Sequence, residues 1–389
     1  MTSSPFSNPQ FTLGIVGGGQ LGKMLLAAAR RMDIAVAVLD PATDAPAQYG
    51  AHRFERGSLA DYATVLNFGR QCQSVVLELE AVNADALIQL EVEGIPCFPP
   101  GRVLRILQNK ARQKAFFAEF GLPTAPFTVY DSIAALHADR AAGAWPLPFV
   151  WKAATGGYDG FGVTLVRSEE QAQALPNGEC LAEALVDLDL EVAVQVARSR
   201  SGETAVFPVT DMDFHPTANQ VEFVVVPTRL STALAAAAQE LALKLVESLE
   251  LVGLLSVEFF VDRSGHLWIN EAAPRPHNSG HWTLEACATS QFEQLVRAAC
   301  DLPLGETTAH GAAAMANVVG AEGHQGPVHY EGALDVLSQP GVHLHLYGKR
   351  ETRPFRKMGH LTAVAETADE ARKRAAEGRD ALRVVTLPQ

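Results

Sequence analysis

The chain has 389 residues and a mass of 41.6 kDa, a length that accommodates two or three domains at roughly 100–200 residues each. Hydrophobic residues make up 48% of it and charged residues 19%, which excludes a disordered or fibrous protein. The 44 acidic residues outnumber the 31 basic ones, for a formal net charge of −13. So acidic a chain binds nucleic acid or anionic membranes poorly, and we expect small-molecule partners.

Cysteine usage and hydropathy indicate the cellular compartment in which the protein works. The five cysteines are scattered without a CxxC pair, which disfavours zinc ribbons, iron–sulfur sites and a disulfide framework. The first ten residues lack the basic and apolar regions of a signal peptide. No uninterrupted apolar run approaches the ~20 residues that span a bilayer. We therefore expect a cytoplasmic protein with reduced thiols and no membrane association.

The first hundred residues alternate short apolar runs with segments of helical periodicity. Such strand–helix alternation with short links predicts a parallel sheet that is covered on both faces. The expected strands are Phe11–Val16, Ile34–Asp40 and Ser74–Leu79, and the expected helices are Gln20–Met32, Asp61–Arg70 and Ala84–Glu93.

Beyond residue 101 the pattern changes. A single helix is predicted over Arg102–Phe120, because Gly121 and Pro123 follow as stop signals. The remaining expected elements are short strands around a glycine-rich loop between 126 and 194, a helix at Thr232–Leu249, a hairpin of Leu254–Val261 with His266–Glu271, a helix at about Ser290–Cys300, a β-rich stretch over 325–365 and a terminal helix at Ala368–Leu382.

A glycine cluster follows the first expected strand. Gly17 to Gly22 matches GxGxxG, and Asp40 ends the next strand, where a dinucleotide fold places a ribose-binding acid. Including Lys23 nearly completes a P-loop, but Met24 lacks the hydroxyl that ligates magnesium there. Glycines at a helix N-terminus let backbone N–H groups approach an anion. A phosphate or other substrate contact, a dinucleotide cofactor and a structural turn stay open.

A second glycine cluster, Thr155–Gly162, lies between two strand-like segments. A glycine-rich loop between strands folds over phosphates as a flap, unlike a strand-to-helix P-loop. Lys152 ends the incoming strand, from which its ammonium group can contact a phosphate as a point charge. The alternative is an ordinary hairpin.

Two carboxylates stand in the apolar strands of the expected hairpin. A four-residue turn would put Val261 opposite His266. In that register Glu258 faces Ile269, and Glu271 lies on the diagonal, about 7–8 Å away between backbones. Two anions among apolar neighbours are costly unless paired or metal-bound, and Mg²⁺ takes one or two carboxylates together with phosphates. A shift of the strand register by one residue would place the two glutamates on opposite faces of the hairpin. The alternative is a structural role in salt bridges.

The segment Pro274–His281 follows and carries His277 and His281, four positions apart. Its prolines and glycine argue against a helix, so the spacing does not place both rings on one face, and metal ligation is disfavoured. A loop of polar donors beside carboxylates is better suited to holding an oxyanion. His343 and His345 alternate on an expected strand, and we interpret them as packing or hydrogen-bonding residues.

A basic run, Lys349–Lys357, contains five of the chain's 31 basic residues and one acid. Clustered Arg and Lys bind a phosphate by forked and point-charge contacts. A solvated basic loop is the alternative. In an otherwise acidic chain, the position of this run favours a local phosphate site.

Four segments together resemble one known family. TGGYDGFG, INEAAPRPHNSGHWT, HLHLYGKRETRPFRKMGH and GGGQLGKM are similar to the 5-(carboxyamino)imidazole ribonucleotide synthase family of ATP-grasp enzymes, over about Leu13 to Leu361. The resemblance implies a mixed α/β and α+β chain, in which a parallel-sheet pre-ATP-grasp domain precedes an ATP-grasp fold and a small β-rich C-terminal segment. The expected domains are 1–106, a small subdomain with the flap at 107–190, a large subdomain at 191–325, and 326–389.

The resemblance implies a reaction of purine synthesis. ATP phosphorylates bicarbonate to carboxyphosphate, and the amine of aminoimidazole ribonucleotide then takes the carboxyl group. This is phosphoryl transfer, in which positioning and charge neutralisation dominate. The cofactors implied are ATP and Mg²⁺, with Mn²⁺ as a substitute, and bicarbonate is the co-substrate. A homodimer is common in the family.

The resemblance also implies roles for individual residues. The ATP set is Lys114 and Lys152 at the phosphates, Gly157 and Gly160 in the flap, Glu183 and Val186 at the adenine, and Glu191 at the ribose. The ribonucleotide set is Gly19, Gln20, Leu21, Glu78, Lys349, Arg356 and Lys357, of which the last three belong to the basic run. The catalytic set is Tyr158, Asp159, Arg275, His277 and Asn278, and the metal set is Glu258, Glu271 and Asn270. Strict alternation turns Asn270 away from the two glutamates, so its ligation requires a twist or a bulge.

Two positions depart from the family pattern. Phe161 stands where the flap more often carries Lys or Arg, and LELEA at 77–81 replaces a motif nearer to YEFEN. A formate-dependent or other purine-pathway ligase is the nearest alternative. A nicotinamide-dependent oxidoreductase would explain the first glycine cluster but not the paired glutamates, and a noncatalytic nucleotide-binding relative would not need the metal and anion residues.

Overall fold

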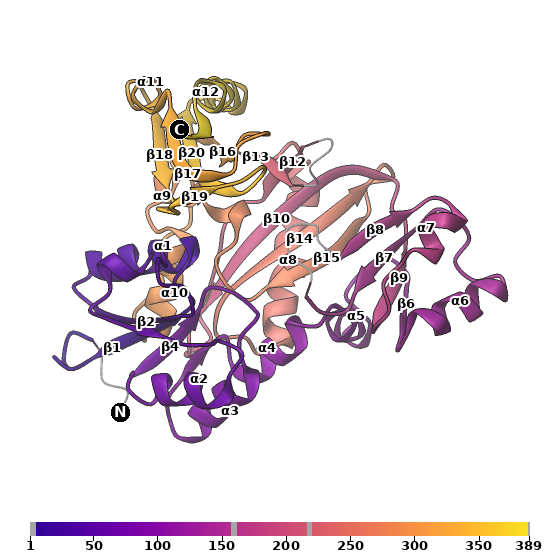
Figure 1. Cartoon of the computed structure of the whole chain (residues 1–389), viewed down its shortest axis with the longest axis horizontal. Coiled ribbons are helices and arrows are strands. Elements are labelled where there is room, and N and C mark those ends of the chain that lie inside the picture. The colour runs from indigo at the N-terminus through magenta and orange to yellow at the C-terminus, as the bar shows by residue number, and fades with distance from the viewer. Residues whose placement is uncertain (1–4, 157–161, 216–219, 388–389) are drawn as a thin grey trace.

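The computed structural model describes residues 5–156, 162–215 and 220–387. Its strands form four sheets, and Figure 1 shows them arranged as an N-terminal unit, a central sheet, a small sheet at one end and a C-terminal unit. No helix among the described residues is both long and apolar enough to cross a membrane.

The N-terminal unit contains the predicted parallel sheet, with strand order β3-β2-β1-β4-β5. Its buried Val, Leu and Ile side chains explain why these segments form central strands covered on both faces. Its strands are β1 (Thr12–Val16), β2 (Ala35–Asp40), β3 (Arg53–Arg56), β4 (Ser74–Leu77) and β5 (Cys97–Phe98), and its helices are α1 (Gln20–Arg31), η1 (Gln48–Gly50), α2 (Tyr62–Gly69) and α3 (Ala84–Val92). The edge strand β3 was not predicted, because its polar sequence RFER lacks an apolar run.

The predicted single helix over Arg102–Phe120 is wrong. The segment forms two helices, α4 (Gly101–Leu107) and α5 (Lys110–Glu119). Asn109 between them is extended, and its side chain accepts a hydrogen bond from the backbone N–H of Arg112 at 2.9 Å. An Asn side chain that caps a new helix competes with continuation of the preceding one. The break places Lys110 at the start of α5.

The small sheet is antiparallel, with order β6-β9-β7-β8, and lies at one end of the molecule (Figure 1). The second glycine cluster connects β7 to β8, as predicted for a flap between strands. The elements of this unit are β6 (Phe127–Tyr130), α6 (Ile133–Ala141), β7 (Phe149–Ala153), β8 (Val163–Val166), α7 (Glu169–Gln173) and β9 (Cys180–Ala184).

The central sheet has nine strands, in the order β15-β14-β10-β12-β13-β16-β20-β18, with β11 paired to β10. Strands of the β-rich C-terminal segment therefore continue the sheet that contains the paired glutamates. Its strands are β10 (Leu188–Arg198), β11 (Thr204–Val206), β12 (Thr210–Phe214), β13 (Val221–Val226), β14 (Gly253–Asp262), β15 (Leu267–Ala273), β16 (Ala312–Val319), β18 (Val342–Leu346) and β20 (Lys357–Ala365).

The remaining elements cover this sheet or close the chain. A three-stranded sheet, in the order β19-β17-β21, lies in the C-terminal unit. The elements are α8 (Thr232–Ser248), η2 (Asn278–Gly280), α9 (Thr283–Ala286), α10 (Gln291–Ala299), β17 (Gly326–Glu331), α11 (Ala333–Leu337), β19 (Glu351–Thr352), α12 (Ala368–Ala381) and β21 (Arg383–Thr386). The predicted division into four domains stays a prediction.

One hydrophobic core joins the N-terminal unit to the central sheet. It contains Leu25 of α1, Phe292 and Leu295 of α10, and Val224 of β13, all 0% exposed. Burying each such side chain contributes roughly 1.5–3 kcal/mol. The segment after β4 thereby contacts the loop that follows β15, through an ion pair of Glu80 with Arg275, and the candidate site adjoins this contact.

Candidate active site

The turn between β14 and β15 differs by one residue from the predicted register. Val261 pairs with Leu267, so the predicted pairing with His266 is wrong. The Asp262 side chain accepts hydrogen bonds from the backbone N–H groups of Ser264 and His266, both at 2.9 Å. These bonds hold the turn and keep His266 outside the strand pairing.

A bulge then restores the carboxylate pair. Phe259 pairs with Ile269, but the next pair is Glu258 with Glu271, so Asn270 is the extra residue. A bulge of this kind turns the side chains that follow it to the other face. The two glutamates therefore lie directly opposite each other, closer than the predicted diagonal. The bulge that Asn270 was expected to need is present.

The two glutamates have opposite electrostatic surroundings. Burial raises the pKa of Glu258, and the charge of the facing Glu271 raises it further. The pKa of Glu271 is lowered, chiefly because the ammonium of Lys110 lies against its carboxylate. Lys110 was not among the predicted site residues. The available signal was its place directly after the capping Asn109.

Lysines of α5 and β7 share one buried carboxylate. Glu183 is 2% exposed and lies 2.8 Å from Nζ of Lys114 and 2.6 Å from Nζ of Lys152. Lys152 also donates to Oδ1 of Asn270 at 2.9 Å. Burial, together with the neighbouring Lys152, lowers the pKa of Lys114 to about 8. Two cations therefore gather beside the bulged hairpin, where ATP phosphates were expected.

The other residues predicted at the nucleotide lie around this cluster. Val186 follows β9 and is half-buried. Glu191 stands on β10 opposite Phe260 of β14, and burial raises its pKa to about 7. Glu183 pairs with the lysines in this structure, and its role at the adenine stays a prediction.

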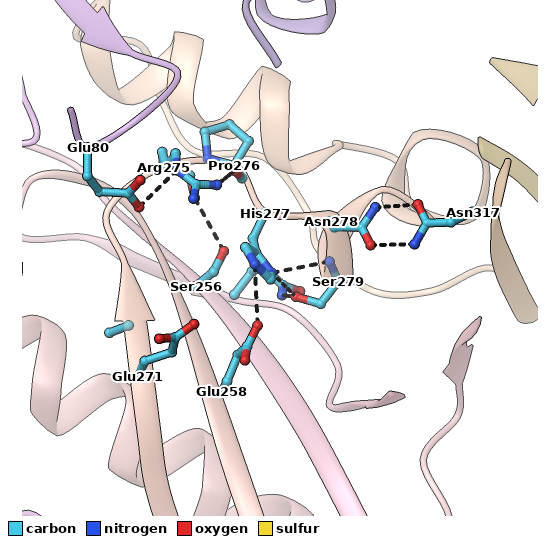
Figure 2. A network of polar contacts seen from close by, with 12 residues as sticks. Glu80, Ser256, Glu258, Glu271, Arg275, Pro276, His277, Asn278, Ser279 and Asn317 are labelled. Carbon is cyan, nitrogen blue, oxygen red and sulfur yellow. Dashed lines mark hydrogen bonds and ion pairs between the residues drawn. The ribbon is translucent and has the colours of Figure 1, made fainter. Parts of the chain in front are cut away.

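The loop after β15 places its polar groups over the carboxylate pair, as Figure 2 shows. Nε of Arg275 lies 2.9 Å from Oε1 of Glu80, which belongs to the N-terminal unit. Nε2 of His277 lies 3.3 Å from Oε1 of Glu258. Asn278 is turned away, because its amide exchanges two hydrogen bonds with Asn317, at 2.9 and 2.8 Å (Figure 2). Glu80 was not among the predicted site residues.

The two histidines of this loop have separate partners. His277 contacts Glu258, whereas His281 is 1% exposed and hydrogen-bonds through Nδ1 to Gln291 at 3.0 Å. The His281 ring also lies 4.8 Å from the ring of His360. Within 5–156, 162–215 and 220–387, no three His, Cys, Asp or Glu side chains gather as a metal-binding group.

The first glycine cluster binds carboxylates of the protein itself. The N–H of Gly18 donates to Asp40 at 2.7 Å, and those of Gly19 and Gly22 donate to Glu78 at 2.7 and 2.5 Å. Asp40 is therefore engaged at this turn and not placed as a free ribose ligand. Burial raises the pKa of Glu78 to about 6, although both backbone bonds act to lower it. The helix N-terminus does attract an anion, and in this structure that anion is Glu78.

The basic run lies beside α1. Nζ of Lys23 donates to the carbonyl of Leu346 at 2.8 Å, which ties the glycine cluster to the start of the basic loop. Nζ of Lys349 donates to the carbonyl of Lys357 at 2.7 Å, and Arg356 donates to the carbonyl of Glu351 at 2.7 Å. The segments that adjoin the two regions predicted to bind the ribonucleotide, 323 residues apart in the chain, therefore meet. Of the flap residues, Gly157, Tyr158, Asp159, Gly160 and Phe161 lie outside the described residues.

Comparisons with known proteins match this arrangement segment by segment. Residues 11–108 match the ribonucleotide synthetase preATP-grasp domain, residues 115–292 the ATP-grasp domain, and residues 313–374 the phosphoribosylaminoimidazole carboxylase C-terminal domain. An N5-carboxyaminoimidazole ribonucleotide synthase of Bacillus subtilis is 37% identical over 374 residues, covering 93% of each chain. One of Brucella melitensis is 37% identical over 362 residues, covering 92% of this chain and 97% of the relative.

The chain belongs to the N5-carboxyaminoimidazole ribonucleotide synthase family. This confirms the predicted family and fold class, and the chain is an ATP-grasp ligase. The solved N5-carboxyaminoimidazole ribonucleotide synthetase of Thermotoga maritima superposes with a TM-score of 0.87 at 37% identity, covering 97% of this chain and all of that one. The Aspergillus clavatus synthase in complex with ADP and 5-aminoimidazole ribonucleotide gives 0.85 at 30% identity, covering 95% and 98%.

Proposed function

We propose that this chain carboxylates the exocyclic amine of 5-aminoimidazole ribonucleotide. The γ-phosphoryl group of ATP passes to bicarbonate and gives carboxyphosphate and ADP. The amine nitrogen then attacks the carboxyl carbon, the bond from that carbon to the phosphate oxygen breaks, and the amine loses a proton. The products are 5-(carboxyamino)imidazole ribonucleotide, ADP and phosphate, as a step of purine biosynthesis.

One observation carries the proposal. The bulge at Asn270 sets Glu271 opposite Glu258 directly beneath Arg275 and His277 (Figure 2). A carboxylate pair suited to a phosphate-bound cation thus adjoins the donors suited to a carboxylate or phosphate oxyanion. Phosphoryl transfer to a small oxyanion needs these two groups next to each other.

The chain's own cations orient the nucleotide in this proposal. Lys114 and Lys152 hold ATP phosphates, and Glu183 keeps both ammonium groups on the same side before ATP arrives. Arg275 contacts bicarbonate and then carboxyphosphate, with its guanidinium oriented by Glu80. His277 and Asn278 complete this oxyanion site, and Glu191 contacts the ribose.

The residues at the bulge fit Mg²⁺. Glu258, Glu271 and the amide oxygen of Asn270 are all oxygen donors, and the charge of Glu271 raises the proton affinity of the facing Glu258, which a cation would relieve. When bound there, Mg²⁺ or Mn²⁺ neutralises phosphate charge. In this structure the ammonium group of Lys110 supplies positive charge beside Glu271. Lys110 would release Glu271 when the metal binds.

The ribonucleotide occupies the junction of the N-terminal unit with the basic run. Gly19, Gln20 and Leu21 line its site, and Glu78 approaches its imidazole. Lys349, Arg356 and Lys357 receive the 5′-phosphate, while Tyr158 and Asp159 approach from the flap. The bond from Lys23 to Leu346 supports this joint site, because it holds the two segments together. A homodimer in the cytoplasm completes the proposal.

The test is a coupled assay of ADP release with MgATP, bicarbonate and 5-aminoimidazole ribonucleotide. We expect ADP release that depends on both bicarbonate and the ribonucleotide, with ¹³C from labelled bicarbonate appearing in the carbamate. In a parallel reaction, formate replaces bicarbonate in degassed buffer. Formate-dependent turnover, or ATP binding without ribonucleotide-dependent ADP release, would refute the proposal.

A further inference from the structure

The backbone beside His277 shows which of its ring nitrogens lacks a proton. The N–H of Ser279 donates to Nδ1 of His277 at 3.3 Å, with His277 as the cap residue of η2. A backbone N–H is always a donor, so the ring nitrogen that receives it must be an acceptor. In a neutral imidazole the proton is then on Nε2.

A relay of two hydrogen bonds, from Gln195 through Ser279 to His277, also indicates that Nδ1 is an acceptor. The hydroxyl of Ser279 lies 2.9 Å from Nδ1 of His277. Nε2 of Gln195 on β10 donates to that hydroxyl, also at 2.9 Å. The hydroxyl has one proton, which goes to Nδ1, and it accepts from the amide with a lone pair. Ser279 and Gln195 are both 0% exposed, so solvent does not compete for these bonds.

The other ring nitrogen of His277, Nε2, lies beside the candidate active site. Nε2 of His277 lies 3.3 Å from Glu258 (Figure 2). We propose that Gln195 and Ser279 are positioning residues that hold His277 in the Nε2–H tautomer, so that the ring donates a hydrogen bond to the reacting anion and does not act as a base. The inference rests on the proposed function in one respect, that the anion beside Nε2 is bicarbonate or carboxyphosphate.

The tautomer decides what the ring can do. A fixed Nε2–H is a preorganised donor for an oxyanion and needs no reorganisation when charge develops. The opposite tautomer would direct a lone pair at the same anion and repel it. The hydrogen bond made by the other ring nitrogen sets the tautomer of a histidine. Residues that never touch substrate therefore control whether His277 stabilises carboxyphosphate.

The direct test is ¹⁵N NMR of the whole protein labelled at its 12 histidines. The His277 resonances are assigned by their loss in His277→Gln. We expect the wild-type protein, free of ligands, to show the Nε2–H pattern for this residue. An Nδ1–H pattern or an imidazolium at pH 7.5 would overturn the inference, and this measurement depends on no variant of the relay.

Two relay variants test the consequence. Gln195→Glu puts a carboxylate where the amide donates, so the Ser279 hydroxyl turns to it and its oxygen becomes an acceptor for Nδ1–H. Ser279→Ala removes the hydroxyl. We expect kcat to fall on the order of 10–100-fold in both, because the ring is held less firmly, with KM for ATP unchanged. An Nδ1–H signal should appear in Gln195→Glu, whereas Ser279→Ala keeps the backbone donor to Nδ1 and should keep the Nε2–H pattern. Ser74→Ala, which removes another buried hydroxyl bond, to the carbonyl of Ala299, should change neither.

The two proposals fail separately. If both relay variants kept the wild-type tautomer and kcat, the positioning role would be refuted. The proposed carboxylation reaction would not be affected by that result. Absence of ribonucleotide-dependent ADP release by the wild-type protein would refute the proposed reaction, yet the NMR pattern would still report whether the relay sets the tautomer.

Discussion

At the residue scale, the charged groups of the candidate site hold one another in place before any ligand is bound. Glu183 bridges Lys114 and Lys152, and Lys110 contacts Glu271. A buried charge without a partner would cost several kcal/mol. ATP and a cation would exchange these partners for phosphate and metal contacts, so the charges need no large movement.

Glu271→Gln tests the metal assignment. The amide has no charge and is a poorer ligand for a hard cation, so we expect ADP release to fall at least about 100-fold. Circular dichroism should show an unchanged fold. Glu250→Gln is the control, because it breaks only an exposed pair with Arg102 and should retain full activity. Activity of Glu271→Gln near that of wild type would refute the assignment.

Lys114 predicts a pH dependence of ATP affinity. Its pKa is lowered to about 8, so above that pH a growing share of the side chain is neutral and attracts phosphate less. We expect Kd for ATP to rise between pH 7.5 and 9, with proton uptake on binding, measured by titration calorimetry in buffers of different ionisation enthalpy. Lys114→Met should bind ATP more weakly and lose this uptake. Equal proton uptake by both proteins would contradict the role.

At the scale of elements, two irregularities position the site. The helix break at Asn109 presents Lys110 to the hairpin, and the bulge at Asn270 turns Glu271 toward Glu258. Regular continuation of either element would aim these side chains elsewhere, since one residue rotates a helix by about 100° and reverses the face of a strand.

Asn109→Ala tests the helix break. It removes the cap bond to Arg112 and the bond to Glu179, at 2.9 Å each, and should lower stability by ~1 kcal/mol. We also expect a higher KM for ATP, because Lys110 loses its fixed start position. Thr367→Ala, at the cap of α12, removes a similar bond far from the site. It should lower the melting temperature without changing KM. Equal KM in both variants would show that the break is only structural.

At the scale of the whole molecule, the candidate site draws its residues from all four units of the fold. The shared core of α1 and α10 fixes the N-terminal unit against the central sheet. The ion pair of Glu80 with Arg275 and the bond from Lys23 to Leu346 cross between units. The chain as a whole thus has a net negative charge, but its Lys and Arg side chains gather where small anions are expected to bind.

Glu80→Gln tests the junction. The neutral amide no longer orients the guanidinium of Arg275, and we expect kcat/KM for bicarbonate to fall about 10-fold or more, because small misplacements of a positioning group are costly. The pair is partly exposed to solvent, so unfolding free energy should change by less than about 1 kcal/mol. Steady-state kinetics and urea denaturation measure the two effects. A loss of stability with unchanged kinetics would make the pair structural.

The sequence by itself determined the local and compositional features of this protein. Apolar runs and glycine turns predicted the parallel sheet, the flap between strands and the two-glutamate hairpin. The motif INEAAPRPHNSGHWT carried the family. These features follow from neighbouring residues, whose periodicity and turn chemistry act over a few positions.

Only the tertiary structure decided which distant groups meet. The bulge at Asn270, the approach of Lys110 to Glu271, and the folding of Glu78 onto Gly19 all depend on contacts between segments far apart in sequence. No local pattern encodes a bulge or an ion pair of this kind, because their free energies come from burial and from charges on other elements. Composition predicted small-molecule partners, and packing brought the residues of the candidate site together.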